Sequence, residues 1–198
     1  METDIWFRPL VWTDYRLAVL FTILFPLILL IWGLLKKSDA VQRLLIIYWR
    51  VASLLMITLY ILIPGWQIGF ISSFAARLLI PISLWFWVDL NDEIEDLPQQ
   101  GLRLAVTSWR WAVTIYCVLG AIGFIPVLPC AFSGEVLETP LCQVWLEAPQ
   151  QYKAIFHPNS TPGFLGFVGV FTLIVYVLYL AYFILVRLGR QGRIAMEQ

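Results

Sequence analysis

One arginine within an apolar stretch is the residue of this sequence most able to do chemistry. Arg77 lies ten residues after Gln67 and thirteen before Leu90, so in a helix it would stand ~15–20 Å from either end of the stretch. A charge at that depth in a bilayer is costly, and such side chains usually face the protein interior and pair. We find no carboxylate in the interior of the apolar stretches, and Asp89 lies three turns away from Arg77. The expected partners are therefore hydroxyl groups, backbone carbonyls, a lipid or quinone oxygen, or an acid of another subunit, and the role of Arg77 can be structural or ligand-binding.

One dense acidic cluster could bind a divalent cation. Its four carboxylates are spaced at i, i+3, i+4 and i+7, and they belong to Asp89, Asp92, Glu93 and Asp96. They would share one face of a continuing helix, and carboxylates in such a pattern can hold Mg²⁺ or Ca²⁺. An enzyme that uses Mg²⁺ there is one alternative. The interpretation we favour is a solvated face that docks a basic patch of a partner or pairs with Arg103 or Arg110, and we predict no metal site.

Three further residue types narrow the chemistry. Arg50 lies about six residues into an apolar stretch, where its stem can reach the headgroups; an anion site shared with Arg77 is the alternative. The single histidine, His157, falls in a long connection, which excludes haem or chlorophyll ligated by histidine within the bilayer and a catalytic Ser-His-Asp unit there. Cys130 and Cys142 either form a disulfide, which requires an oxidising compartment, or remain two thiols.

The composition places these residues in a membrane protein. Apolar residues make up 61%, aromatic residues 16% and charged residues 13% of the 198 residues, whereas a soluble domain is about half apolar and a quarter charged. Thirteen Lys and Arg balance thirteen Asp and Glu, so the chain lacks the basic field that attracts nucleic-acid phosphates. We therefore expect a lipid bilayer, and no nucleic acid, as its surroundings.

Five stretches are long and apolar enough to cross the hydrocarbon layer, which takes about 20 helical residues. They cover residues 17–35, 44–63, 67–90, 109–132 and 163–186. Because they are continuously apolar and do not alternate, they predict helices and not the strands of a membrane barrel. The predicted fold is an all-α polytopic helix bundle with about five transmembrane helices.

Charge and loop length predict how the chain is divided and oriented. We expect an interfacial segment at 1–16, a membrane domain at 17–186 with a long connection at 133–162, and a basic tail at 187–198. Eight basic residues fall on one side of the membrane: Lys36, Lys37, Arg43, Arg103, Arg110, Arg187, Arg190 and Arg193. Three fall on the other: Arg8, Arg16 and Lys153. The positive-inside rule then places the C-terminus inside, and the N-terminus and the long connection in the periplasm or lumen.

Glycines at two places predict close helix contacts. Gly120 and Gly123 lie in the fourth stretch, and Gly163, Gly166 and Gly169 begin the fifth. Small residues let helix backbones approach within a membrane, so we expect interfaces there, either within the bundle or with another protein.

Three segments carry a resemblance to a known family: residues 64–69 (PGWQIG), 77–81 (RLLIP) and 83–94 (SLWFWVDLNDEI). The chain resembles an uncharacterised multi-spanning membrane protein family of cyanobacteria over most of its length. The resemblance implies a thylakoid or plasma membrane of an oxygenic phototroph and an accessory part in the assembly of a photosystem or a related complex. It supplies no catalytic residues.

The sequence contains neither a catalytic set nor an internal repeat. We therefore expect a non-enzymatic accessory or assembly subunit, which binds a larger membrane complex through helix faces and loops. The resemblance implies that this complex is a photosynthetic one of the photosystem type. The alternative is a small-molecule transporter, or a protein that binds a quinone, lipid or pigment, in which Arg77 meets an oxygen of the ligand. A bound chlorophyll, carotenoid or lipid is compatible with either function.

Overall fold

The computed structural model describes residues 6–98 and 100–188, and this part of the chain is mainly helical, without strands. Five helical segments are long and apolar enough to cross a membrane: Arg8–Leu35, Asp39–Leu62, Ile68–Trp85, Gln100–Ala131 and Pro162–Val186. The predicted all-α membrane bundle is therefore confirmed. Residues 189–198, which include Arg190 and Arg193 of the predicted basic tail, lie outside the described residues.

The five spans are built from the following elements. The first consists of α1 (Arg8–Val19), a π-helical turn (Leu20–Leu24) and α2 (Phe25–Leu35). The next three are α3 (Asp39–Leu62), α4 (Ile68–Trp85) and α6 (Gln100–Phe124), which continues into a 3-10 turn (Ile125–Ala131). The fifth is α9 (Pro162–Tyr182), followed by a π-helical turn (Phe183–Leu188). Three shorter helices connect the spans: α5 (Val88–Glu95), α7 (Gly134–Leu137) and α8 (Pro140–Phe156).

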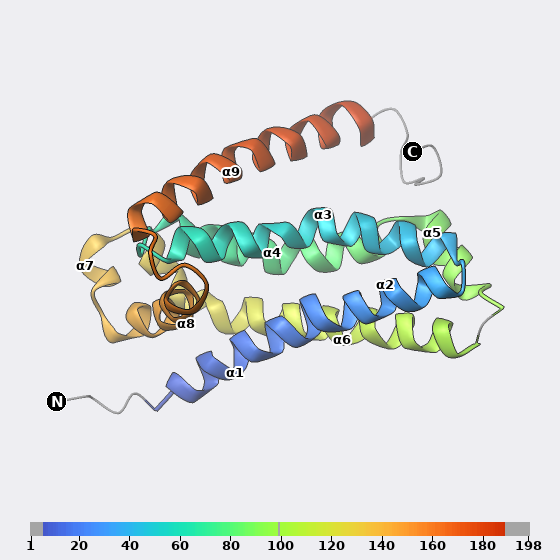
Figure 1. Ribbon diagram of the computed structural model, residues 1–198, viewed down its shortest axis with the longest axis horizontal. Coiled ribbons are helices and arrows are strands. Elements are labelled where there is room, and N and C mark those ends of the chain that lie inside the picture. Colours follow the sequence, from blue (N-terminus) through green and yellow to red (C-terminus); the bar gives the residue numbers. More distant parts are fainter. Residues whose placement is uncertain (1–5, 99, 189–198) are drawn as a thin grey trace.

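The bundle has two distinct ends. In Figure 1, α3 and α4 lie side by side at its centre, with α1, α2 and α6 on one side and α9 on the other. The start of α1, the turn between α3 and α4, α7 and α8 form one end, which we name the α8 end. The turn between α2 and α3, α5 and the start of α6 form the opposite end, which we name the α5 end. At the α3–α4 turn, Gly65 has a φ of 77°, a conformation that favours glycine.

Side chains of two neighbouring helices hold the π-helical turn of the first span. The hydroxyl of Tyr48 on α3 donates to the carbonyl of Thr22 at 2.8 Å, and the indole Nε1 of Trp109 on α6 donates to the carbonyl of Phe21 at 2.9 Å. Tyr48 is fully buried. In a membrane, backbone groups that leave the regular helix pattern must find such partners. These two bonds therefore fix the first span against both α3 and α6.

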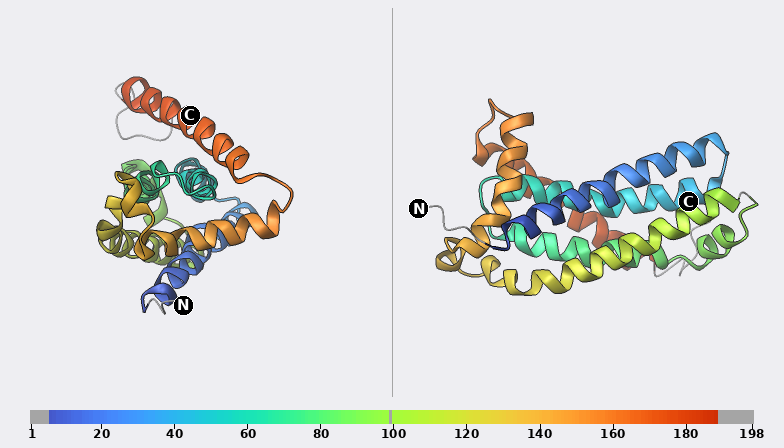
Figure 2. Two further views of the ribbon diagram at one scale, coloured as in Figure 1. Left: turned by 90° about the vertical axis from the view of Figure 1, so that its left-hand side faces the viewer. Right: turned by 90° about the horizontal axis from the view of Figure 1, so that it is seen from below.

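The connection at 133–162 is largely helical. It contains α7 and α8, and α8 lies across the α8 end of the bundle (Figure 2). Pro140 occupies the first turn of α8, where the missing N–H of proline costs nothing. Cys130 and Cys142 form a disulfide with 5.9 Å between their Cα atoms, which joins the 3-10 turn to α8. Cys142 packs in a buried cluster that includes Phe124, so α8 is held on the bundle covalently and by apolar packing.

The last span packs on the others through glycine. A Cβ on Gly169 would lie 2.8 Å from Cγ1 of Ile61, and one on Gly166 would lie 2.5 Å from Cγ of Pro64. The predicted glycine contact is thus an interface within the bundle, where α9 meets α3 and the following turn. Gly163, by contrast, faces open space. In Figure 1 the later part of α9 diverges from α3 and α4, but Tyr176 still packs in a buried cluster with Leu54 and Ala76. Only 6% of the residues in the most apolar part of α9 are buried.

Candidate functional site

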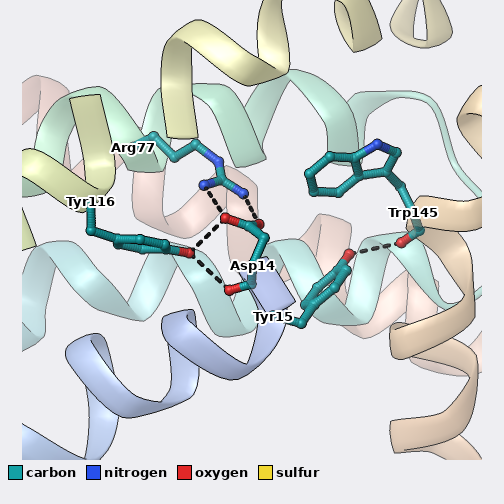
Figure 3. Close-up of polar contacts among 5 residues, drawn as sticks. All are labelled: Asp14, Tyr15, Arg77, Tyr116 and Trp145. Atoms are coloured by element: carbon teal, nitrogen blue, oxygen red, sulfur yellow. Dashed lines mark hydrogen bonds and ion pairs between the residues drawn. The ribbon is translucent and has the colours of Figure 1, made fainter. Parts of the chain in front are cut away.

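Arg77 pairs with a carboxylate of the same chain. It lies on α4 with 7% of its surface exposed, and its Nη1 and Nη2 donate to Oδ1 and Oδ2 of Asp14 at 3.1 and 2.6 Å (Figure 3). Our expectation that the spans hold no carboxylate was wrong. The helix of the first span begins at Arg8, nine residues before the predicted start. Asp14 is thereby carried about 9 Å along that helix and into the bundle.

Tyr116 completes this polar group. Its hydroxyl lies 3.0 Å from Oδ1 and 3.1 Å from the backbone carbonyl of Asp14, and it donates to that pair of acceptors. The two guanidinium nitrogens and this hydroxyl therefore satisfy the carboxylate of Asp14 with charge-assisted bonds, which are stronger than neutral ones. Three elements far apart in the sequence, α1, α4 and α6, meet at this one carboxylate.

Aromatic rings enclose the guanidinium of Arg77. Its Cζ lies 5.4 Å from the ring centroid of Phe124, 5.9 Å from that of Trp145 and 6.0 Å from that of Tyr116. Rings at this distance stabilise a cation through their quadrupole. Trp145 belongs to α8, and its carbonyl accepts a hydrogen bond from the hydroxyl of Tyr15 at 2.7 Å (Figure 3). The helix held by the disulfide thus closes the site at the α8 end.

Gly120 provides the space for the arginine. A Cβ at this position would collide with Nη1 of Arg77, whereas a Cβ on Gly123 would meet nothing within 4 Å. Of the two glycines predicted to allow a close helix contact, only Gly120 makes one, and its contact is with the side chain of Arg77 on α4.

A cavity of about 430 Å³ lies beside the pair. Residues of α1 and its π-helical turn, α3, α4 and α6 line it. Val19 and Met56, two of the lining residues, are 47% and 40% exposed, so the cavity reaches the lipid-facing surface. The lining is mostly apolar, and the indole Nε1 of Trp49, another lining residue, is buried without a hydrogen-bond partner within the described part of the chain. A buried donor of this kind costs free energy until it meets an acceptor.

The structure does not bring Arg50 to this site. Arg50 is exposed on α3 and lines a second cavity of about 240 Å³, together with Ser83 of α4 and Tyr176 of α9. Arg77 is not among the residues that line this second cavity. The two arginines therefore line different cavities, and the structure does not support an anion site that both of them share.

The acidic cluster lies at the α5 end, on and just after α5, far along the bundle from Arg77. Nη2 of Arg43 on α3 donates to Glu93 at 2.8 Å, whereas we expected Arg103 or Arg110 as the basic partner of the cluster. Arg103 donates to the carbonyl of Glu95 at 3.0 Å. Within the described residues, no group of three or more His, Cys, Asp or Glu side chains is placed to hold a metal ion. Of the four carboxylates, Asp92 and Asp96 are exposed, while Asp89 and Glu93 are half-buried.

Arg110, the other expected partner of that cluster, has a structural role. It is 2% exposed, and its Nη2 donates to the carbonyl of Leu84 at 2.7 Å and to Oδ1 of Asn91. Its guanidinium also lies 4.0 Å from the ring centroid of Trp85. Leu84 is in the last turn of α4, whose carbonyls have no helical donor. Arg110 therefore caps α4 and fixes the corner between α4 and α5.

His157 lies next to two tyrosines at the α8 end. Its Nε2 is 2.8 Å from the hydroxyl of Tyr60, and its ring centroid is 5.9 Å from that of Tyr152. Burial and the hydrogen bond with Tyr60 raise the pKa of the Tyr152 phenol above its ordinary value. This group ties the end of α8 to α3 and is separate from the site around Arg77.

Comparison with known proteins gives one match. A family model described as "Protein of unknown function (DUF3177)" matches residues 8–196. No curated protein and no solved structure matches the chain. The matched range includes all five spans and every residue of the site around Arg77.

Proposed function

The chain belongs to the DUF3177 family of proteins of unknown function, and from the geometry of its own site we propose that it binds an amphipathic small molecule within the membrane. The observation that carries this proposal is the cavity beside Asp14 and Arg77, which joins a buried polar group to the lipid-facing surface. A ligand of the lipid, quinone or pigment-tail class combines the polar and apolar parts that such a cavity accommodates.

The size and lining of the cavity support this proposal. Its volume of about 430 Å³ falls within the range of roughly 300–1,000 Å³ that is typical of small-molecule sites. Such sites are mainly apolar and contain a few polar groups that orient the ligand. Here the indole Nε1 of Trp49 and the polar group of Asp14, Arg77 and Tyr116 are the polar part of the wall, while Val19 and Met56 lie where the cavity reaches the lipid. The polar head of a ligand would lie toward this part of the wall and its tail toward the bilayer.

Filling the cavity is expected to remove the ligand. We predict that Ala18→Trp, which places a large side chain on the α1 wall, lowers the amount of co-purified amphiphile at least about tenfold, because the bulk occupies the ligand's volume. Leu119→Trp is the matched control, since Leu119 is 64% exposed on α6 and does not line the cavity. The measurement is mass spectrometry of organic extracts of the purified proteins. Equal extracts from the wild type and both variants would contradict the proposal.

A second candidate function is that of a non-enzymatic accessory subunit of a larger membrane complex. What supports it is α9, which contacts the bundle near Gly166 and Gly169. Only 6% of the residues in its most apolar part are buried within the chain. Phe167, Phe171 and Leu178 are 63%, 61% and 65% exposed along this helix. The resemblance to a cyanobacterial family favours a photosystem-type complex in a thylakoid membrane as the partner.

This candidate predicts a complex that survives mild detergent. The wild-type protein is expected to co-migrate with a chlorophyll-containing complex on a native gel of cyanobacterial membranes. A variant with Phe171→Ala and Leu178→Ala is expected to lose most of this co-migration, because contacts at buried aromatic anchors dominate association. Ile115→Ala with Ile122→Ala, on the exposed face of α6, is the control. A wild-type protein that migrates only by itself would overturn the accessory function.

We also propose an orientation. Lys36, Lys37, Arg43 and Arg103 lie at the α5 end, so the positive-inside rule favours this end as the cytoplasmic or stromal one. The α8 end then faces the periplasm or lumen. An oxidising compartment on that side agrees with the disulfide between Cys130 and Cys142.

A further inference from the structure

We infer that the cavity selects amphiphiles whose head group is neutral and offers an acceptor oxygen, and that it discriminates against anionic ones. This inference rests on the ligand-binding function proposed above, and it names the chemical class of the ligand. Two observations carry it: the charge balance of the cavity wall and the unpartnered donor of Trp49.

The wall of the cavity has no net charge. Among the described residues that line it, only Asp14 and Arg77 are charged. Their side chains are 19% and 9% exposed, and they form a two-pronged pair through both oxygens and both terminal nitrogens. A carboxylate or phosphate brought into this space would add a negative charge that no group of the wall balances. An uncompensated charge in a low-dielectric site is strongly disfavoured.

Arg77 is not available as a counter-ion for such a ligand. Nη1 and Nη2 already donate to Asp14, and the rings of Phe124 and Trp145 lie near the guanidinium. An anionic head group that reached the remaining N–H groups of the guanidinium would bring a second negative charge to a single positive one. If it displaced the carboxylate of Asp14 instead, that carboxylate would be the unbalanced charge, so neither arrangement balances the wall.

One buried donor of the wall lacks an acceptor. The indole Nε1 of Trp49 is buried without a partner in the described residues, and an indole N–H donates but cannot accept. A carbonyl, ester or hydroxyl oxygen satisfies it. A neutral head group with such an oxygen therefore fits both the charge and the hydrogen-bonding capacity of the wall.

Changing Asp14 is expected to reverse this selectivity. Asp14→Asn keeps the shape of the side chain and leaves one positive charge, that of Arg77, beside the cavity. An anionic head group then becomes the missing counter-ion and is expected to bind in preference to a neutral one. A merely structural role of Asp14 would lower stability without inverting the ligand preference.

The test compares two probes with the same alkyl chain, hexadecanol and hexadecanoate. Binding of each is measured on the purified full-length protein in a neutral detergent, at a pH that keeps the carboxylate of hexadecanoate ionised. We expect the wild type to bind hexadecanol at least about tenfold more tightly, and Asp14→Asn to bind hexadecanoate at least about tenfold more tightly; each tenfold is 1.4 kcal/mol. Asp39→Asn, an exposed acid at the start of α3, is expected to keep the wild-type preference.

A thermal shift serves as the second measurement if Asp14→Asn is only marginally folded. Because a ligand that binds the folded state raises Tm, hexadecanoate should raise the Tm of this variant and hexadecanol that of the wild type. A wild type that prefers hexadecanoate, or an Asp14→Asn protein that keeps the wild-type preference, overturns the inference and leaves ligand binding intact. A wild type that binds neither probe contradicts the proposed function itself.

Discussion

Replacing Arg77 by methionine is expected to lower the free energy of unfolding by about 3–5 kcal/mol, the usual loss when one partner of a buried ion pair is removed. Methionine has a similar length and is apolar, so it keeps most of the packing with Phe124. It leaves the carboxylate of Asp14, 19% exposed, with the hydroxyl of Tyr116 as its remaining side-chain donor. Denaturant unfolding of the protein in detergent, followed by tryptophan fluorescence, measures the change.

Removing the other partner of the ion pair is expected to lower the free energy of unfolding by at least as much. Asp14→Leu leaves the guanidinium of Arg77 buried, and an arginine cannot lose its proton in a protein. With both changes together, no charge remains in the site, and an apolar pair of similar volume often replaces a buried ion pair at little cost. The double variant should therefore be clearly more stable than the sum of the single losses implies.

An exposed ion pair of the same chain provides the control for this cycle. Nε of Arg8 lies 2.9 Å from Glu147, but the two side chains are 48% and 28% exposed. Exposed pairs typically contribute about 0–1 kcal/mol, so Arg8→Met should have a small effect. Equal losses for Arg8→Met and Arg77→Met would show that the burial of the second pair has no energetic consequence, contrary to our interpretation.

The fold of the spans could be predicted from the sequence because the bilayer sets a simple length requirement. Every apolar stretch that is long enough to cross became a helix of the bundle. What hydropathy could not give is where a span begins when charged residues surround its start. Residues 8–16 contain Arg8, Asp14 and Arg16, so we began the first span after them, while the structure continues the helix through them.

The partner of Arg77 was missed for the same reason, although the sequence contains a signal for it. Val11, Asp14, Ala18 and Thr22 are spaced by three, four and four residues, which puts them on one face of a helix. Val11 and Thr22 are buried in the structure. An acid on a buried helical face is the natural partner for an arginine in another span, and this face could have been found had the helix been extended to Arg8.

The segment at 133–162 was predicted only as a long connection, because it lies between the fourth and fifth apolar stretches. Pro140 and Pro162 both stand in the first turns of helices, α8 and α9, where proline is favoured and does not break a helix. Whether a proline stands in the first turn of a helix depends on where that helix begins, which the amino-acid composition does not show. Trp145, which lies on this segment, could therefore not be assigned to the surroundings of Arg77 from sequence alone.

Substitution of Gly120 by alanine is expected to destabilise the protein by about 1–3 kcal/mol, as overpacking of a filled site usually does. The new methyl group would collide with Nη1 of Arg77. This nitrogen is held by its bond to Asp14, and the aromatic rings of Phe124 and Trp145 flank the guanidinium. The arginine can yield only by losing part of its ion pair. Thermal unfolding in detergent gives the size of the loss.

The matched control lies one turn further along the same helix. Gly123→Ala adds a methyl group that meets nothing within 4 Å, and glycine inside a helix is about 0.5–1 kcal/mol less favourable than alanine. Gly123→Ala should therefore leave the stability unchanged or raise it, whereas Gly120→Ala lowers it.

Combining Gly120→Ala with Arg77→Met then tests whether the guanidinium causes the loss. If Gly120 is glycine because of the guanidinium, Gly120→Ala loses most of its penalty once that group is absent, since the flexible methionine can move aside. A penalty that stays unchanged in the Arg77→Met background would contradict the role of Gly120 in making room for the ion pair.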